Sequence, residues 1–590
     1  MGKRNWFALN NALVIIAFLL GLGLRFYNLG AFPLSDSEAA RALQALNLSR
    51  VQPFDTSLQP LHIIGTGLLF TMFSSSNTWA RFLPAFMGSL MVLTPLLFHT
   101  KFGRSATLIM IFGLAIDPGL VITSRQIDSP IIAIALFIFS LGFLFNRQTI
   151  FAGVTIGLLL LTGAGAVQAA LIVLMIFLAA RLFHLPPFVE NQPFDSPTNA
   201  KPWLNFVWAI ISTIVIASTF FLKYQSGFAS WVESLLLFFT NWLTIVRTPP
   251  LSAILALIIY QPLALIFAVI AAIRRWKTHP ILVPYLFFWI IAGILLVILY
   301  PARQVSDVAW VLFPLWGLAS LELGDIKFIS SEHTRMSLGV GALIILVFPL
   351  IWLNAAGFVQ GTFYSQTTLL RMAVLIGLFA LLALSVILVG FGWSWRTART
   401  GAILGLGVVF VIYLFASITA AQYTNPYRQR ELWTKSPSVG DTDLLLATVA
   451  DISEWNTGLR DQIDIKISIE SPAMHWLLRE FPALEDIEDS ANPLGNSPSL
   501  ILTQADDSQP QLAASYRGQD FVWWVTPEWD NLTTINLFSW LTTRTVPMSY
   551  EYVILWGRGD LFPGGSDFGD DSDLNSACLL YTSPSPRDRS

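Results

Sequence analysis

The stretch ILVPYLFFWIIAGILLVIL, residues Ile281–Leu299, decides the fold class, because it is long, apolar and free of charge. A membrane-spanning helix needs roughly 20 mostly apolar residues, since no lipid group can satisfy an open backbone. Only 12% of the 590 residues are charged and 54% are hydrophobic, whereas a soluble domain carries about 25% charged residues. The sequence therefore predicts an integral membrane protein that crosses the bilayer about a dozen times. Similar blocks are Ala12–Leu24, Ile131–Phe145, Phe151–Ala164, Ala253–Ile273, Leu338–Leu353 and Ala373–Gly390.

Thirteen spans account for the apolar blocks, and the lysines and arginines between them predict the orientation. An odd number of spans places the N-terminus in the cytoplasm and the C-terminal region outside. The predicted spans are 11–28, 79–98, 105–122, 128–146, 149–165, 166–183, 203–222, 250–272, 281–300, 307–322, 337–357, 371–393 and 401–420. The fourteen cations of the predicted cytoplasmic side are Lys3, Arg4, Lys101, Arg104, Arg147, Arg181, Lys201, Arg274, Arg275, Lys277, Lys327, Arg335, Arg396 and Arg399. The nine of the other side are Arg25, Arg41, Arg50, Arg81, Arg125, Lys223, Arg247, Arg303 and Arg371.

One short apolar stretch, Leu61–Phe73, is interpreted as a helix lying at the outer surface. If it crosses the membrane instead, every later orientation inverts and the cation bias disappears. The N-terminal run ends in Leu24-Arg25-Phe26-Tyr27-Asn28 without a small-residue cleavage site, so it is not a cleavable signal. The single cysteine, Cys578, excludes a disulfide framework and a cysteine-rich metal site. The net charge of −3 carries no indication of a nucleic-acid partner.

The composition changes near Tyr423 and predicts three regions: a membrane domain over 1–422, a small extracytoplasmic α/β domain over 423–565, and a disordered tail over 566–590. Strand-like runs alternating with helix-like stretches support the middle region. Residues 578–590 resemble a translated sequencing adapter and are set aside as an artefact. The strand-like runs are Ile463–Ile469, Ser499–Leu502, Phe521–Val525 and Tyr552–Trp556, and the helix-like stretches are Asp443–Glu454, Ala473–Phe481 and Thr534–Thr543.

Ionisable residues at the outer membrane face are the main functional lead, because charge at membrane depth is costly. Asp36 and Glu38 follow the first span and are candidates for a general base or for the ligands of a divalent cation. The alternative interpretation is structural, with equal weight: Ser35 and Glu38 form a capping box and Asp36 suits the helix dipole.

Two further loops carry an arginine and an aspartate. Arg125 can hold a phosphate, with Asp128 across the site, although a boundary ion pair with Asp128 capping the next helix is the favoured alternative. Arg303 is placed for a lipid-linked phosphate, or it pairs with Asp307 four residues on.

The stretch Gln59-Pro60-Leu61-His62 offers a ligand or proton carrier in His62, although a lone histidine is more often a surface polar group. No GxxxxGK[ST], HExxH or GxSxG pattern occurs, so nucleotide hydrolysis and the common hydrolase chemistries lack support.

Four stretches in order resemble the lipid-dependent, GT-C-type glycosyltransferases, in the broad protein-mannosyltransferase and aminoarabinose-transferase group (family 39-like). They are Arg25-Phe-Tyr-Asn-Leu-Gly-Ala-Phe-Pro-Leu with the acidic pair after it, Gln59-Pro-Leu, Trp79-Ala-Arg81-Phe-Leu-Pro-Ala-Phe and Ser124-Arg125-Gln-Ile-Asp128. The resemblance implies an all-α polytopic membrane protein of about 13 transmembrane helices, GT-C-like, with the small C-terminal α/β extracytoplasmic domain. Individually each motif is weak, but the ordered set covers residues 10–150.

The resemblance also implies a reaction, namely sugar transfer from a polyprenyl-phosphate donor to a glycan, lipid or protein acceptor at the outer face of a bacterial cytoplasmic membrane. It assigns the catalytic acids to Asp36, Glu38 and Asp128. Substrate contacts fall on Arg125, Arg81, Arg303, Gln59 and His62. No cofactor is implied beyond a divalent cation at Asp36 and Glu38.

Two other functions compete with the transferase. A transporter or flippase for lipid-linked sugars would show internal repeats and broken helices near the midplane; no repeat is evident, and the charges gather at one face. A non-catalytic family member acting in envelope assembly is the third hypothesis.

Overall fold

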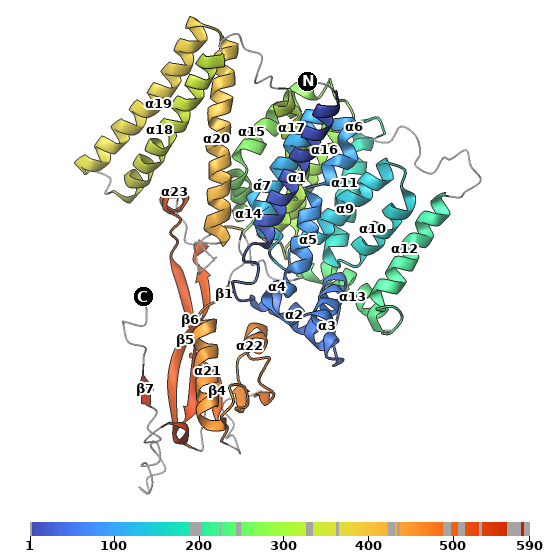
Figure 1. Ribbon diagram of the computed structural model, residues 1–590, viewed down its shortest axis with the longest axis vertical. Coiled ribbons are helices and arrows are strands. Elements are labelled where there is room, and N and C mark those ends of the chain that lie inside the picture. Colours follow the sequence, from blue (N-terminus) through green and yellow to red (C-terminus); the bar gives the residue numbers. More distant parts are fainter. Residues whose placement is uncertain are drawn as a thin grey trace. The chain divides into compact units, whose positions relative to one another are not determined.

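A computed structural model describes residues 3–187, 202–224, 226–243, 249–325, 334–361, 365–422, 431–433, 437–487, 497–505, 514–529, 534–562 and 580–582 (Figure 1). The chain divides into two compact units. The helical unit comprises Met1–Gly30, Asn47–Lys435 and Trp529–Val546, and the sheet unit comprises Ala31–Leu46, Ser436–Glu528 and Pro547–Ser590. The predicted cations Lys201, Arg247 and Lys327, and Cys578, lie outside the described residues.

The helical unit confirms a mostly α-helical membrane protein. Each predicted span overlaps a helix, and two further helices, the short α6 and the longer α13, lie outside the predicted spans and the other predicted helices. The helices are α1 Lys3–Phe26, α3 Pro60–Met72, α4 Asn77–Ala80, α5 Phe82–Met91, α6 His99–Phe102, α7 Arg104–Ile116, α8 Pro118–Thr123, α9 Ile131–Phe145, α10 Thr149–Leu160, α11 Ala164–Leu182, α12 Pro202–Ser218, α13 Ser226–Thr240, α14 Pro250–Tyr260, α15 Pro262–Arg275, α16 Leu282–Leu299, α17 Ala309–Gly324, α18 Thr334–Gln360, α19 Gln366–Gly392, α20 Trp395–Gln422 and α23 Thr534–Thr543. The 3₁₀ turns are η1 Thr94–Phe98, η2 Asn241–Leu243 and η3 Val305–Val308.

Among the described residues, seven helices are long and apolar enough to cross a membrane, and α14 with α15 adds an eighth if the bent pair is one span. Six shorter apolar helices, including α3, remain below that length. The count of thirteen therefore stays a prediction. α3 has 13 residues, about 20 Å at 1.5 Å per residue, which is shorter than the roughly 30 Å hydrocarbon core.

α17 forms the centre of the helical unit. Every residue from Ala309 to Glu322 is buried, and the helix packs against α7, α9, α15 and α16. A helix that is apolar on all sides is stable only inside such a bundle or in lipid. α19 is the opposite case, since only Thr368 and Gly390 are buried; it packs with α18 and α20 (Figure 1).

The predicted span 250–272 is not one straight helix. α14 and α15 meet at an angle of 89°. Pro262 begins α15 and has no N–H group, so the hydrogen-bond ladder of α14 cannot continue through it. The chain turns at Gln261, whose side chain is buried.

The sheet unit is a mixed sheet with helices, as predicted for the C-terminal region. Its strand order is β1-β5-β6-β4-β2-β3, in which β2 pairs in parallel with β3 and β4, and β6 pairs antiparallel with β4 and β5. The bounds are β1 Ser438–Val439, β2 Ile465–Ile467, β3 Leu484–Asp486, β4 Leu500–Gln504, β5 Tyr516–Pro527, β6 Met548–Arg558 and β7 Leu580–Thr582, with helices α2 Asp36–Ser49, α21 Thr442–Thr457 and α22 Pro472–Leu477 and the 3₁₀ turn η6 Gly559–Leu561.

The unit boundaries differ from the predicted domains in two places. Ala31–Leu46 clusters with the sheet, and Trp529–Val546, which contains α23, clusters with the helices. The tail also differs, because β7 pairs in parallel with Arg517–Gln519 of β5. An open sheet edge accepts any extended segment through backbone hydrogen bonds, which requires no apolar pattern in that segment.

Candidate functional site

Two of the resembling stretches hold each other through reciprocal arginines in the helical unit. Arg25 Nε donates to Ser124 Oγ at 3.1 Å, and its other nitrogens donate to carbonyl oxygens of Leu114 and Ala115 in the last turn of α7. Arg125 in turn donates to carbonyl oxygens at the end of α1, at 3.1 Å from Arg25, 2.6 Å from Tyr27 and 2.9 Å from Asn28. The last carbonyl groups of a helix have no partner within it. Arg125 therefore satisfies the end of α1, which carries Arg25, and Arg25 satisfies the end of α7, the helix before α8.

Asp128 lies three residues after Arg125, in the turn between α8 and α9. Ser129 Oγ holds this turn by donating to the carbonyl oxygen of Thr123 at 2.6 Å. Asp128 is not the N-cap residue of α9, because that residue is Pro130, which makes no side-chain cap hydrogen bond. The carboxylate is partly exposed.

The other two resembling stretches also meet. His62 Nε2 lies 3.1 Å from the carbonyl oxygen of Ala80 and 3.3 Å from Thr66 Oγ1. The histidine is fully buried, so its interpretation as a surface group is wrong. Arg81 and Gln59 are buried as well, and Gln59 Oε1 has no hydrogen-bond partner among the described residues.

Arg303 and Asp307 each serve a different helix end. Arg303 Nε and Nη2 donate to the carbonyl oxygens of Val297 and Ile298 at 2.9 and 3.0 Å, at the end of α16. Asp307 accepts the backbone N–H of Gln304 at 2.9 Å in a capping box for η3. Like Arg125, Arg303 thus directs its donors to helix carbonyl groups.

The first acidic pair lies in the sheet unit. Glu38 accepts the backbone N–H of Ser35 at 3.2 Å, and Ser35 Oγ accepts the N–H of Glu38 at 3.4 Å, which confirms the predicted capping box. Asp36 has a different use. Its carboxylate accepts the Ser471 hydroxyl at 2.5 Å, the Ala473 backbone N–H at 3.0 Å and the indole N–H of Trp524 at 2.8 Å.

Comparison with protein-family profiles gives no match, and comparison with curated protein sequences gives none. Solved structures are similar. The crystal structure of the aminoarabinose transferase ArnT from Cupriavidus metallidurans bound to undecaprenyl phosphate has a TM-score of 0.52 and 12% identity, over 95% of this chain and 100% of that one. The chain has a GT-C-type glycosyltransferase-like fold.

Two more structures are similar to this GT-C-type fold at lower scores. ArnT from the same organism in the apo state has a TM-score of 0.48 and 13% identity, covering 83% of this chain and 87% of that one. The Archaeoglobus fulgidus oligosaccharyltransferase, in complex with Zn and sulfate, has a TM-score of 0.41 and 13% identity, covering 80% of this chain and 62% of that one.

Sequence reasoning missed a buried acid in this GT-C-type fold. Asp117 is fully buried at the start of α8, where it accepts the N–H of Leu120 at 2.9 Å and the indole N–H of Trp316 at 2.6 Å. The sequence carries a signal for it, since Asp117-Pro118-Gly119 interrupts a predicted span and an acid at membrane depth is unusual. Its oxygens join α8 to the central helix α17.

A second missed group surrounds Glu431. Its carboxylate accepts the Tyr260 hydroxyl and, at 3.1 Å, a guanidinium N–H of Arg544. Burial raises the pKa of Glu431, while Arg544 and Tyr260 act to lower it. No local pattern marks this set, because its members come from three distant segments.

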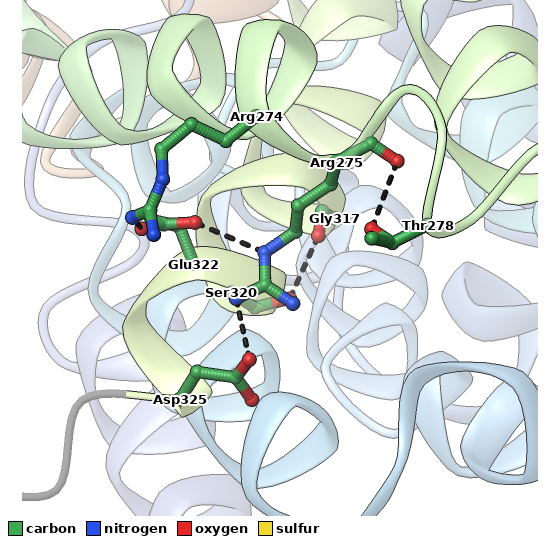
Figure 2. Close-up of polar contacts among 7 residues, drawn as sticks. All are labelled: Arg274, Arg275, Thr278, Gly317, Ser320, Glu322 and Asp325. Atoms are coloured by element: carbon green, nitrogen blue, oxygen red, sulfur yellow. Dashed lines mark hydrogen bonds and ion pairs between the residues drawn. The ribbon is translucent and has the colours of Figure 1, made fainter.

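The ends of α15 and α17 are joined by ion pairs. Figure 2 shows Glu322 beside Arg274 and Arg275, with Asp325 against Arg275. Arg275 lies 2.9 Å from Glu322 and 2.5 Å from Asp325. Both arginines were counted toward the cytoplasmic side, and at the C-terminal end of α15 they also suit its dipole. These contacts join the ends of the two helices.

Within the part of the chain that the structure describes, no three His, Cys, Asp or Glu side chains are grouped so as to hold a metal ion. The divalent cation at Asp36 and Glu38 stays a prediction.

Proposed function

We propose that this protein transfers a sugar from a polyprenyl-phosphate-linked donor to an acceptor at the outer face of a bacterial cytoplasmic membrane. The observation that carries the proposal is the likeness in fold to ArnT, which spans all of that chain and was solved with undecaprenyl phosphate bound. The acceptor is a glycan, a lipid or a protein, and the outer placement rests on the predicted cation bias.

In the proposed reaction an acceptor oxygen attacks the anomeric carbon of the sugar. The bond between that carbon and the phosphate oxygen breaks, and the polyprenyl phosphate leaves with the bonding pair. Asp36 orients the acceptor hydroxyl and takes its proton. Arg81, Arg125 and Arg303 are the proposed cations that offset the charge on the departing phosphate. Asp128 is the second candidate base.

The test is to incubate membranes containing the protein with a panel of polyprenyl-phosphate sugars and to measure the lipid phosphate released. We expect release by the wild type, and release lowered on the order of 10²- to 10⁴-fold by Asp36→Asn at normal yield. A fully active Asp36→Asn variant would move the base to Asp128, and Asp128→Asn then decides. Movement of intact lipid-linked sugar across the membrane without release would instead identify a flippase.

A further inference from the structure

The carboxylate of Asp36 is held by an ordered set of donors from the C-terminal part of the sheet unit. Oδ1 accepts the Ser471 hydroxyl at 2.5 Å and the Ala473 backbone N–H at 3.0 Å. Oδ2 accepts the indole N–H of Trp524 at 2.8 Å. A carboxylate has about four lone-pair positions, so three are filled and one, on Oδ2, remains.

The Ser471 hydroxyl has only one hydrogen to donate, and its surroundings commit that hydrogen to Asp36. Its oxygen accepts the backbone N–H of Met474 at 3.4 Å and the indole N–H of Trp523 at 3.1 Å. A hydroxyl oxygen has two acceptor positions and both are used. The Ser471 hydrogen therefore points to Asp36.

Neighbouring tryptophans reach this one point because β5 is irregular there. Successive side chains of a strand point to opposite faces, yet Trp523 contacts Ser471 and Trp524 contacts Asp36. The register of β5 against β6 shifts between Val522 and Trp524. Such a bulge inserts one residue and re-aims side chains, and bulges are frequent beside active sites.

The position of Asp36 is fixed from its own side as well. The capping box of Ser35 and Glu38 holds the first turn of α2. A catalytic group must be held in its productive orientation by neighbours whose own positions are locked.

We propose that Trp524 and Ser471 are positioning residues for Asp36, so that the C-terminal sheet is part of the catalytic apparatus. This inference rests on the proposed function. The three donors fix the direction of the remaining Oδ2 lone pair, which accepts the hydroxyl of the sugar acceptor. Neither residue touches the substrate; both act through Asp36.

The experiment compares Trp524→Phe with Trp556→Phe in the full-length protein. Trp556 is the control, because it lies in the neighbouring strand β6 of this sheet and its indole N–H donates to Thr503 Oγ1 at 3.0 Å, without contact to Asp36. We expect Trp524→Phe to lower kcat for lipid phosphate release about 10- to 100-fold with KM for the donor unchanged, as for the loss of a hydrogen bond to a charged group. Trp556→Phe should keep wild-type activity.

A second pair covers the case in which Trp524→Phe does not fold. Ser471→Ala should lose activity to a similar degree, whereas Ser471→Thr keeps the hydroxyl and should restore it. In the Asp36→Asn background, Trp524→Phe should cause no further loss.

Equal activities of Trp524→Phe and Trp556→Phe, or of Ser471→Ala and Ser471→Thr, would overturn the positioning role. Higher activity of Trp524→Phe would also overturn it, because the contact would then restrain Asp36. A wild type that releases no lipid phosphate from any donor is a separate result, and it contradicts the proposed function itself.

Discussion

Replacing Arg544 with methionine tests whether the buried Glu431–Arg544 pair secures α23 within the helical unit. The Glu431 side chain is 2% exposed and that of Arg544 is 19% exposed. Arg544 also lies over the ring of Trp540, 4.6 Å from its centroid, and donates to the Tyr413 hydroxyl at 3.2 Å. Methionine keeps much of the apolar stem but removes every one of these polar contacts.

The expected cost follows from the burial of Glu431. Removing one partner of a buried ion pair leaves an uncompensated charge and costs about 3–5 kcal/mol. Burial already raises the pKa of Glu431 while Arg544 acts to lower it, so the loss of Arg544 should raise that pKa further. At about 1.36 kcal/mol per factor of ten, the opening equilibrium of α23 should increase on the order of 10²-fold or more.

Hydrogen exchange along α23, Thr534–Thr543, measures this opening directly. The control is Arg460→Met, because Arg460 is 66% exposed and pairs with exposed Asp451 of α21. Hydrogen exchange in α21 should change only a few-fold in this variant, since exposed ion pairs contribute about 0–1 kcal/mol. The double variant Glu431→Leu/Arg544→Met should recover most of the loss, as no buried charge remains. Unchanged exchange in α23 of Arg544→Met, or a double variant worse than the single, would refute the reasoning.

Three further predictions concern other parts of the chain. Gly405→Leu should destabilise the packing of α18 and α20 by about 1–3 kcal/mol in thermal unfolding, because a Cβ at Gly405 would lie 2.8 Å from the Gly341 carbonyl oxygen. The control Gly407→Leu should be tolerated, because a Cβ at Gly407 would have nothing within 4 Å. Burial raises the pKa of Tyr516 to about 12 from 10.0. The stability that the neutral Tyr516 hydroxyl contributes is therefore present below pH 10 and is lost as pH rises through about 12. The difference in tyrosinate absorbance between the wild type and Tyr516→Phe should titrate near pH 12. Reporter fusions at Gly458 and Lys277 should report opposite sides of the membrane, and the same side for both would contradict the predicted topology.

The sequence predicts those features that depend on neighbours along the chain. The run Thr534–Thr543 was predicted as a helix and is α23 with the same bounds. The capping box at Ser35 and Glu38 needs only a four-residue pattern and is present. The apolar blocks became helices because a helix satisfies its own backbone wherever it is buried.

Features set by distant residues could not be predicted in this way. The sequence places α23 within the C-terminal domain, but α23 clusters with the helical unit, and Arg544 directly after it pairs with Glu431, 113 positions away. The helix α13, Ser226–Thr240, lies between predicted spans and carries Glu233, so its apolar pattern was not recognised as a helix. The break at Gln261 was missed because Pro262 follows an apolar run that continues on both sides.

The arginines of the candidate site show why residue type alone does not distinguish an arginine that binds a phosphate from one that satisfies the carbonyl groups of a helix end. Arg125 and Arg303 are predicted to bind a phosphate, which stays a proposal, and both direct guanidinium N–H groups to carbonyl oxygens at helix ends. A carbonyl at a helix end and a phosphate oxygen are both acceptors with negative charge, and a buried guanidinium suits either. For Arg125 the partner is the end of α1 and for Arg25 it is the end of α7, so packing by itself is a reason for an arginine in each of the two resembling stretches. Asp36 differs from them, because its partners leave one lone pair of Oδ2 to bind a further donor. The chemistry of this fold is therefore to be tested first at that oxygen.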